Sequence, residues 1–251
     1  MDKIPQKMRE ASVERLNTYS LKWKRIDYIV MHFLIRDLKY AISKFASGKI
    51  LDVGCGNKPY ESLFHTSREN YIGCDVVQSS DDKVDILCLA TDINAPSDSF
   101  DTVFSTQVME HVDNSDLMMS ECNRVLRSDG YLVLSVPFSW ELHEEPYDFF
   151  RFTKYGLMEL CKRNNFEVIE IIPNGGKWAA IAQLNMNIFF SALKKKNIIL
   201  RGIRFLLINL HITSLLNWIA IKIDNMAFDP LFTLNYVLIA KKIKSTTTIE
   251  S

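Results

Sequence analysis

The chain has 251 residues, of which 47% are hydrophobic and 24% charged, and its 30 basic side chains are balanced by 30 acidic ones. This length and composition predict one globular domain with room for an added subdomain. Because the formal charge is zero, the chain lacks the excess of Lys and Arg that binding to phosphate backbones needs. Nucleic acid is therefore disfavoured as a partner.

The N-terminal stretch MDKIPQKMREASVERLNTYS is polar and has no apolar segment, so we do not expect a secretory signal. The five cysteines are scattered and include no Cys-x-x-Cys pair, which argues against a disulfide framework and against a zinc site. We expect reduced thiols and a cytoplasmic protein.

Apolar residues recur at helical spacing between residues 21 and 45, which predicts a helix packed beside a sheet. Short apolar runs then alternate with helical patterns, as in a parallel sheet that is covered on both faces. The strands are expected at 50–54, 71–75, 84–88, 101–106, 131–137, 166–172 and 232–243, and the helices after Pro59, at 115–126, at 154–164 behind the N-cap Thr153, and over 178–226.

A glycine turn follows the first strand in the stretch KILDVGCGNKPYESLF. Gly54 and Gly56 allow backbone to approach a ligand closely, and Asp75 at the end of the second strand can accept hydrogen bonds from ribose hydroxyls. These features predict a nucleoside derivative. A dinucleotide would need a third small residue where Pro59 stands, and Asp52 suits a positively charged ligand better than two phosphates.

Four segments in this order, ILDVGCGNKPY, YIGCDV, SFDTVFSTQVMEHV and LRSDGYLVLSVP, resemble the class I S-adenosylmethionine-dependent methyltransferases, in the branch often called methyltransferase type 11. The resemblance covers residues 49–137 well. It implies an α/β, Rossmann-like fold with a seven-stranded, mostly parallel sheet, helices on both faces and an antiparallel last strand. The domains would be an N-terminal helical segment 1–48, a cofactor-binding core 49–176, a helical insertion or lid 177–228, the final strand 229–243 and a disordered tail 244–251.

The same resemblance implies the residues that bind the cofactor, S-adenosyl-L-methionine. They are Asp52, Gly54, Cys55 and Gly56 for the methionine part, Asp75 and Val76 for the ribose, and Thr106 and Gln107 for the methyl-bearing end. The family usually has an acidic residue near the adenine amine where this chain has Leu89. Either Leu89 and Ala90 hold adenine by packing and backbone, or Asp92 takes the acidic role.

The pair Glu110 and His111 raises the question of a metal. Some quinone methyltransferases of the superfamily are expected to use such a pair together with an acidic residue three positions earlier, and here that position is Gln107. Adjacent side chains on a helix also point about 100° apart. We therefore favour a pocket-shaping role and expect no metal.

The loop PFSWELHEEPYDFFRFT follows the fifth predicted strand and should face the methyl acceptor. His143 is our first choice as the base that removes a hydroxyl proton, and Glu144 or Asp148 would orient or replace it. Tyr147 and Arg151 are candidate substrate-binding residues. Alternatively the loop is a solvated one in which Arg151 pairs with Asp148. Similar HExPYDFxRxT stretches occur in bacterial methyltransferases that resemble members of surface-saccharide gene sets, which favours a sugar hydroxyl.

The run FLLINLHITSLLNWIAI, residues 205–221, carries no formal charge and is slightly short for a membrane-spanning helix. We favour a helical subdomain buried over the acceptor pocket. The alternative is a surface within residues 194–222 that lies on the inner face of a membrane, with Lys194, Lys195 and Lys196 toward anionic lipid.

The leading hypothesis is thus an enzyme of saccharide biosynthesis that O-methylates a hydroxyl of a small molecule, a saccharide or a lipid-linked saccharide. Two alternatives are a nicotinamide-dependent oxidoreductase and a non-catalytic S-adenosylmethionine-binding partner protein. The sequence leaves the acceptor, the methylated atom and the oligomeric state open.

Overall fold

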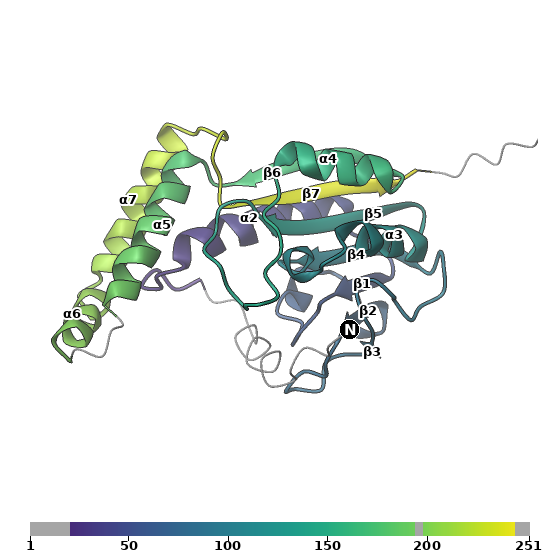
Figure 1. The fold of residues 1–251 in the computed structure, drawn as a ribbon, viewed down its shortest axis with the longest axis horizontal. Coiled ribbons are helices and arrows are strands. Elements are labelled where there is room, and N and C mark those ends of the chain that lie inside the picture. Colours follow the sequence, from purple (N-terminus) through teal and green to yellow (C-terminus); the bar gives the residue numbers. More distant parts are fainter. Residues whose placement is uncertain (1–20, 194–197, 244–251) are drawn as a thin grey trace, which may run out of the picture.

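The computed structural model describes residues 21–193 and 198–243, which form one central sheet flanked by helices (Figure 1). The sheet has seven strands in the order β3-β2-β1-β4-β5-β7-β6, and β7 runs antiparallel to both of its neighbours. The predicted fold class is therefore confirmed. The strands are β1 (Ile50–Val53), β2 (Tyr71–Asp75), β3 (Ile86–Leu87), β4 (Phe100–Thr106), β5 (Leu126–Pro137), β6 (Phe166–Asn174) and β7 (Asn235–Lys242).

Successive side chains of each strand point to opposite faces of the sheet, and apolar side chains lie on both faces. Helices therefore cover both faces. Helix α2 (Tyr28–Phe45) packs on the face that carries Val133 and Val237. Helices α3 (Ser115–Val125) and α4 (Lys154–Arg163) pack on the opposite face. Thr153 caps α4 as predicted, since its Oγ1 accepts a hydrogen bond from the Gly156 amide at 3.1 Å.

The predicted helix after Pro59 is wrong. Only two short 3₁₀ turns, Glu61–Leu63 and Arg68–Asn70, lie between β1 and β2. Pro, Ser, Thr and Asn residues in this segment favour turns over helix. The buried rings of Tyr60 and Phe64 pack edge-to-face against Phe104, so aromatic side chains cover the sheet there in place of a helix.

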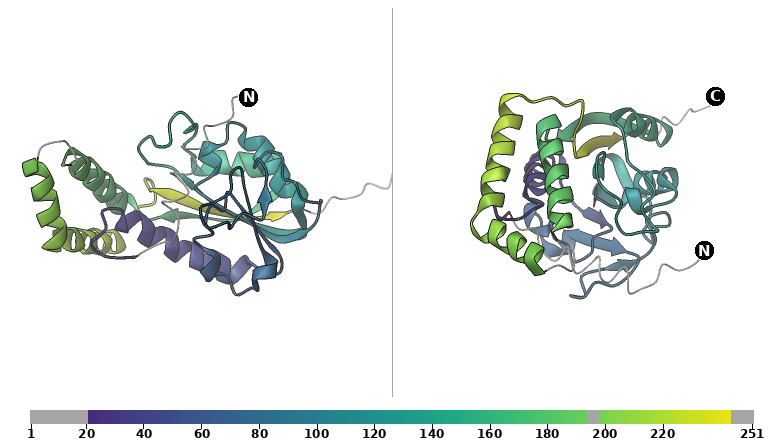
Figure 2. Two further views of the ribbon diagram at one scale, coloured as in Figure 1. Left: turned by 90° about the horizontal axis from the view of Figure 1, so that it is seen from below. Right: turned by 60° about the vertical axis from the view of Figure 1, so that its left-hand side comes forward.

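Three helices between β6 and β7 form what we call the helical subdomain: α5 (Lys177–Ala192), α6 (Ile198–Asn209) and α7 (Ile212–Met226). It projects from the sheet beyond the N-terminal end of α2 (Figures 1 and 2). Side chains of α5 and α7 share an apolar core with Phe33 and other residues of α2, whereas α6 has no buried residue.

Within the described part of the chain, no single helix is long and apolar enough to cross a membrane. Helices α6 and α7 meet the length and hydropathy requirement only as a pair, and the pair is bent by 60°. Residues 1–20 of the predicted N-terminal segment 1–48, the three lysines 194–196 and the predicted tail 244–251 lie outside the described residues.

The fold brings the carboxyl ends of β1, β2, β4 and β5 to one edge, because these strands pair in parallel. The candidate site residues lie near the carboxyl ends of these strands or in the loops that follow them, except for Leu89, Ala90 and Asp92, which follow β3. Parallel sheets of this kind bind ligands at that edge.

Candidate active site

The turn after β1 holds its glycines in left-handed conformations, with φ of +74° at Gly54 and +49° at Gly56. A Cβ at Gly54 would lie 2.4 Å from the Val108 side chain, so this glycine is required by packing. A Cβ at Gly56 would have no atom within 4 Å. The space above Gly56 is therefore open to a ligand that approaches the backbone.

Asp75 ends β2 beside this turn and is held by backbone amides. Its two carboxylate oxygens accept hydrogen bonds from the Gly56 amide at 3.1 Å and the Val76 amide at 2.7 Å. The carboxylate is thus fixed next to the turn before any ligand binds. The sequence prediction that Gly56 and Asp75 act together agrees with this geometry.

Asp52 is buried below the turn and accepts a hydrogen bond of 2.7 Å from the Tyr71 hydroxyl. Burial raises the pKa of the Asp52 carboxyl to about 7, although the Tyr71 hydrogen bond acts in the opposite direction. A cationic ligand group near this carboxyl would favour its ionised form. Cys55 is buried too, and burial raises the pKa of its thiol, so it packs in the turn as a neutral group.

A hollow of about 470 Å³ lies beside β3 and is lined by Leu89, Asp92 and neighbouring residues. The Leu89 side chain is 46% exposed, and Leu89 pairs with Asp92 through an isolated antiparallel bridge. Both predicted ways of holding adenine, through Leu89 and Ala90 or through Asp92, therefore involve the same short segment.

Gln107 follows β4 with a φ of +54°. Its backbone amide and its side-chain amide both donate to Ser135 on β5, the first to the carbonyl at 2.9 Å and the second to Oγ at 3.2 Å. This pairing anchors the end of β4, and Thr106 precedes it. The two residues predicted beside the methyl-bearing end thus sit between the cofactor turn and the groups described next.

A short 3₁₀ turn, η3 (Met109–His111), follows and buries Glu110 completely. Neither carboxylate oxygen of Glu110 has a hydrogen-bond partner among the residues the structure describes. Burial raises the pKa of this carboxyl to about 8. The backbone carbonyl of Glu110 accepts the Phe149 amide at 2.8 Å, which ties η3 to the loop between β5 and α4.

That loop, residues 138–153, is called the acceptor loop below. Arg151 folds it: the guanidinium donates to both oxygens of Asp148, at 2.6 and 2.7 Å, and to the carbonyls of Trp140, Phe150 and Glu141. The Asp148 side chain is 1% exposed, and the Arg151 partner lowers the pKa of its carboxyl to about 2. The side chains of Arg151 and Asp148 therefore make their hydrogen bonds within the acceptor loop.

His143 lies at the centre of the acceptor loop. Its backbone amide donates to Asp148 Oδ2 at 2.9 Å, and its ring Nδ1 lies 3.3 Å from that oxygen and 3.3 Å from the Glu141 carbonyl. Burial, followed by the charge of His111, lowers the pKa of the imidazole. His143 is thus neutral at neutral pH, and Asp148 orients it.

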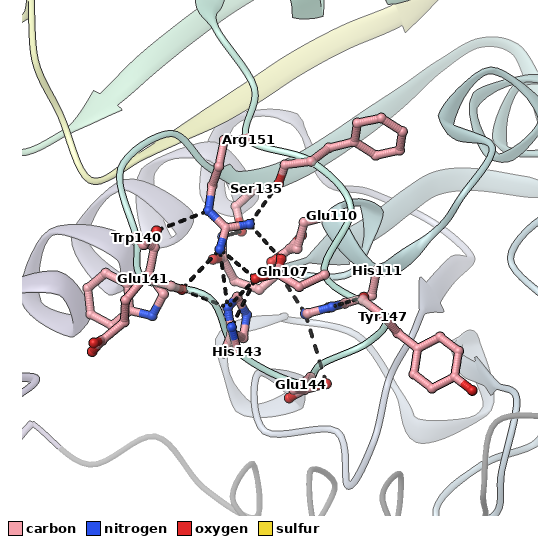
Figure 3. A network of polar contacts seen from close by, with 12 residues as sticks. Gln107, Glu110, His111, Ser135, Trp140, Glu141, His143, Glu144, Tyr147 and Arg151 are labelled. Carbon is pink, nitrogen blue, oxygen red and sulfur yellow. Dashed lines mark hydrogen bonds and ion pairs between the residues drawn. The ribbon is translucent and has the colours of Figure 1, made fainter.

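His111 meets His143 edge to face, with ring centroids 4.8 Å apart. The Tyr147 carbonyl accepts a hydrogen bond of 2.7 Å from His111 Nδ1, and Nε2 lies 3.9 Å from carboxylate oxygens of both Glu110 and Glu144. Figure 3 shows these groups gathered around one point, with the Tyr147 ring directed away from it. Tyr147 therefore contributes its backbone carbonyl to the cluster.

The sequence interpretation missed that Glu110 and His111 approach His143. It treated the pair as helical neighbours that diverge, whereas in η3 their ligand atoms lie within 4.8 Å of one another and of His143. Only the contact between η3 and the acceptor loop reveals this, and the sequence holds no local signal of it.

Comparison with known proteins identifies the core. Residues 51–134 match the family model described as methyltransferase domain. Among curated proteins, none matches this chain. The match to the family model spans about a third of the chain and supports an S-adenosylmethionine-dependent methyltransferase, with S-adenosyl-L-methionine as the cofactor.

Solved structures share the fold at low identity. A chain in the complex of the Haloferax volcanii Trm112 methyltransferase activator is 12% identical with a TM-score of 0.55, and the match covers 96% of this chain and 100% of that one. The [4+2]-cyclase SpnF is 18% identical with a TM-score of 0.53, covering 85% and 81%. The Burkholderia thailandensis 1,6-didemethyltoxoflavin-N1-methyltransferase is 14% identical with a TM-score of 0.50, covering 94% and 80%. Because one of these is a cyclase, the shared fold does not assign the reaction, and the acceptor must be inferred from the site.

Proposed function

We propose that this enzyme transfers the methyl group to a hydroxyl oxygen of a small molecule or saccharide. The observation that supports this most directly is the imidazole of His143, which Asp148 and the Glu141 carbonyl orient at the carboxyl edge of the sheet. Methyl transfer from a sulfonium needs an aligned nucleophile, and a hydroxyl nucleophile must also lose its proton. An imidazole with a lowered pKa is unprotonated and available for that task.

The surroundings of His143 support an acceptor at this place. Gln107, which is predicted to lie beside the methyl-bearing end of the cofactor, is among the residues gathered around His143 in Figure 3, and this supports an acceptor bound against His143. The partly exposed side chains of His111 and Glu144 give the acceptor polar contacts, as a molecule rich in hydroxyl groups requires.

The more specific part of the proposal is that the acceptor is a saccharide. It draws on the resemblance of the stretch around His143 to bacterial methyltransferases of surface-saccharide gene sets. A lipid-linked saccharide would also suit the exposed apolar side chains of the helical subdomain.

Untargeted mass spectrometry of a strain that lacks the gene tests the proposal. Glycan and glycolipid fractions should contain a species lighter than its wild-type counterpart by the mass of one methylene group. Purified enzyme and S-adenosylmethionine should restore the missing mass in that fraction, and base-stable attachment should identify an ether. A lost methyl group that is found on nitrogen or carbon would refute hydroxyl methylation.

A further inference from the structure

We propose that Glu110, His111 and His143 bind one divalent transition-metal ion, such as Zn²⁺ or Co²⁺, on the acceptor side of the active site. Each residue offers one ligand atom, and the three atoms lie within 4.8 Å of one another. Two imidazoles and one carboxylate form a donor set that suits first-row transition metals better than Mg²⁺ or Ca²⁺, which prefer oxygen ligands alone.

Glu110 is the strongest indication. Its side chain is fully buried, and neither oxygen finds a hydrogen-bond donor in the described part of the chain. A buried carboxylate without a partner is costly unless a cation or a set of donors compensates it. His111 Nε2 lies 3.9 Å from Glu110 Oε1, and the positive charge of Arg151 also acts on this carboxyl.

His111 is oriented as metal ligands usually are. Its Nδ1 faces the Tyr147 carbonyl at 2.7 Å, which fixes the tautomer with the proton on Nδ1 and leaves the Nε2 lone pair for a ligand. His143 Nδ1 faces the Glu141 carbonyl and Asp148, and Arg151 Nη2 also lies 3.5 Å from it. The acceptor loop therefore supplies the second shell of the proposed site.

The ligand atoms of Glu110, His111 and His143 need to move only slightly closer together to bind one ion. Ligand atoms at about 2.1 Å from a cation lie roughly 3 to 3.5 Å apart. The imidazoles of His111 and His143 are 18% and 25% exposed, so their side chains can turn toward Glu110 without disturbing the core. Glu144, whose Oε2 is 3.9 Å from His111 Nε2, can add a further oxygen ligand.

The catalytic consequence rests on the proposed function. A hydroxyl oxygen of the acceptor that joins the cation loses its proton to water more readily, because the positive charge stabilises the alkoxide. The alkoxide then attacks the methyl carbon, a C–O bond forms, and the S–C bond breaks with its electron pair remaining on sulfur. With the cation bound, His143 would act on the acceptor through the cation and would no longer be the proton acceptor itself.

Cobalt titration tests the site, since the visible spectrum of bound Co²⁺ distinguishes nitrogen and oxygen ligands from thiolate. The wild-type protein should bind one Co²⁺ without thiolate bands, and Zn²⁺ should displace it. Glu110→Gln and His143→Ala should each weaken binding by at least about 100-fold, since even loss of an outer-shell partner costs 10- to 100-fold. His65→Ala, which removes an exposed histidine elsewhere, should bind like the wild type.

Two outcomes would overturn the site: no binding by the wild type, or equal binding by wild type and Glu110→Gln. Retained S-adenosylhomocysteine binding by each variant shows that it has folded. The titration needs no acceptor, so its result is separate from that of the methylation assay. Co²⁺ bound without hydroxyl methylation would refute the proposed function alone.

A different observation supports a second inference: we infer that the helical subdomain rests on an anionic phospholipid surface. We call Ile198, Ile199, Phe205, Leu206 and Leu210 the apolar tip; they are between 55% and 82% exposed. The favoured prediction of a subdomain buried over the acceptor pocket is contradicted for α6, which has no buried residue.

The basic residues of the helical subdomain favour an anionic phospholipid surface as the partner of the apolar tip. Residues 177–228 contain seven basic side chains and one acidic side chain, whereas the rest of the chain has 23 basic and 29 acidic ones. The one acid, Asp224, is buried and accepts hydrogen bonds from the Gly176 and Ala179 amides. Of the basic residues, Lys177 is paired with Asp229. Exposed apolar side chains flanked by Arg201 and Arg204 suit the interface of an anionic bilayer.

Vesicle sedimentation tests the inference. The protein should sediment with vesicles of phosphatidylglycerol and phosphatidylcholine, and only weakly with phosphatidylcholine alone. The double variants Phe205→Ser/Leu206→Ser and Arg201→Gln/Arg204→Gln should each weaken binding about tenfold or more. Tyr155→Ser, which removes a side chain that is 74% exposed on α4, is the matched control and should sediment normally.

Equal sedimentation with both kinds of vesicle, or none with either, would overturn the membrane inference. So would light scattering that shows a dimer which Phe205→Ser/Leu206→Ser converts to a monomer, because the apolar tip would then be covered by a second copy of the chain.

Discussion

The cofactor side and the acceptor side of the active site lie on one sheet edge but are built differently. On the cofactor side, groups are already bonded to each other: the Gly56 amide donates to Asp75, and Tyr71 donates to Asp52. On the acceptor side, Glu110 is buried without a hydrogen-bond partner among the described residues, beside two partly exposed imidazoles. The cofactor side is thus preorganised to bind S-adenosylmethionine, whereas the Glu110 carboxyl and the two imidazoles on the acceptor side can still bind a further group.

The difference also decides what each side demands of the sequence. The cofactor side depends on backbone conformation in short turns directly after strands, which only a few residue types allow. The acceptor side depends on a meeting between η3 and the acceptor loop, made by backbone contacts such as that between Phe149 and Glu110. Substitutions on the two sides should therefore have separable effects on cofactor affinity and on rate.

The largest expected effect is on the acceptor side. His143→Ala should slow methyl transfer by roughly 10² to 10⁴, the range for loss of a group that removes a proton, while S-adenosylhomocysteine affinity stays within about twofold. Single-turnover kinetics and calorimetry measure the two quantities. Turnover close to that of the control His65→Ala would assign catalysis to alignment alone.

The two sides also differ in how much of each could be predicted from the sequence. Strand positions and the Thr153 cap could be predicted, because short apolar runs and capping residues are local signals. The antiparallel β7 was predicted only through the resemblance to the methyltransferase family. The helix after Pro59 was wrong because aromatic packing of Tyr60 and Phe64 replaces it. The cluster around Glu110 was missed because residues more than 30 positions apart in sequence form it. The exposure of α6 was missed because an uncharged run has the same composition whether it is buried or open to solvent.

Substitutions at Gly56 and Gly54 test the cofactor side in two different ways. Gly56→Val should fold, because a Cβ there meets no atom within 4 Å, but its side chain occupies the space above the turn and should weaken S-adenosylhomocysteine binding by more than about 100-fold. The left-handed φ of +49° adds a strain of about 1 to 2 kcal/mol to the fold. Calorimetry and thermal unfolding measure both.

Gly54→Val provides the contrast, since its Cβ would lie 2.4 Å from Val108. This variant should lose stability before it loses affinity. If Gly56→Val binds the cofactor normally, the ligand does not approach that backbone.

A smaller effect is expected at Asp75. Asp75→Ala should weaken S-adenosylhomocysteine binding by about 1 to 3 kcal/mol, through loss of charge-assisted hydrogen bonds to the ribose and of the anchor for the Gly56 amide. Asp75→Asn, which keeps one carbonyl acceptor, should lose less. Calorimetry that finds equal losses for the two variants would locate the effect in the turn rather than in the ribose contact.

The smallest effect is a pH dependence carried by Asp52. Its pKa in the folded protein is about 7, above the ordinary 3.8, so the folded state retains a proton that the unfolded state releases. The free energy of unfolding should therefore fall as the pH rises from about 4 to about 7, and Asp52→Asn should remove this slope. The cofactor's ammonium group favours the ionised carboxyl, so S-adenosylhomocysteine affinity should rise over the same range and be about tenfold weaker at pH 6 than at pH 8. Calorimetry across this range measures it, with Asp52→Asn giving a flat profile. A flat profile for the wild type as well would mean that the ammonium group does not lie near Asp52, and the assignment of the methionine part to this end of the turn would have to be changed.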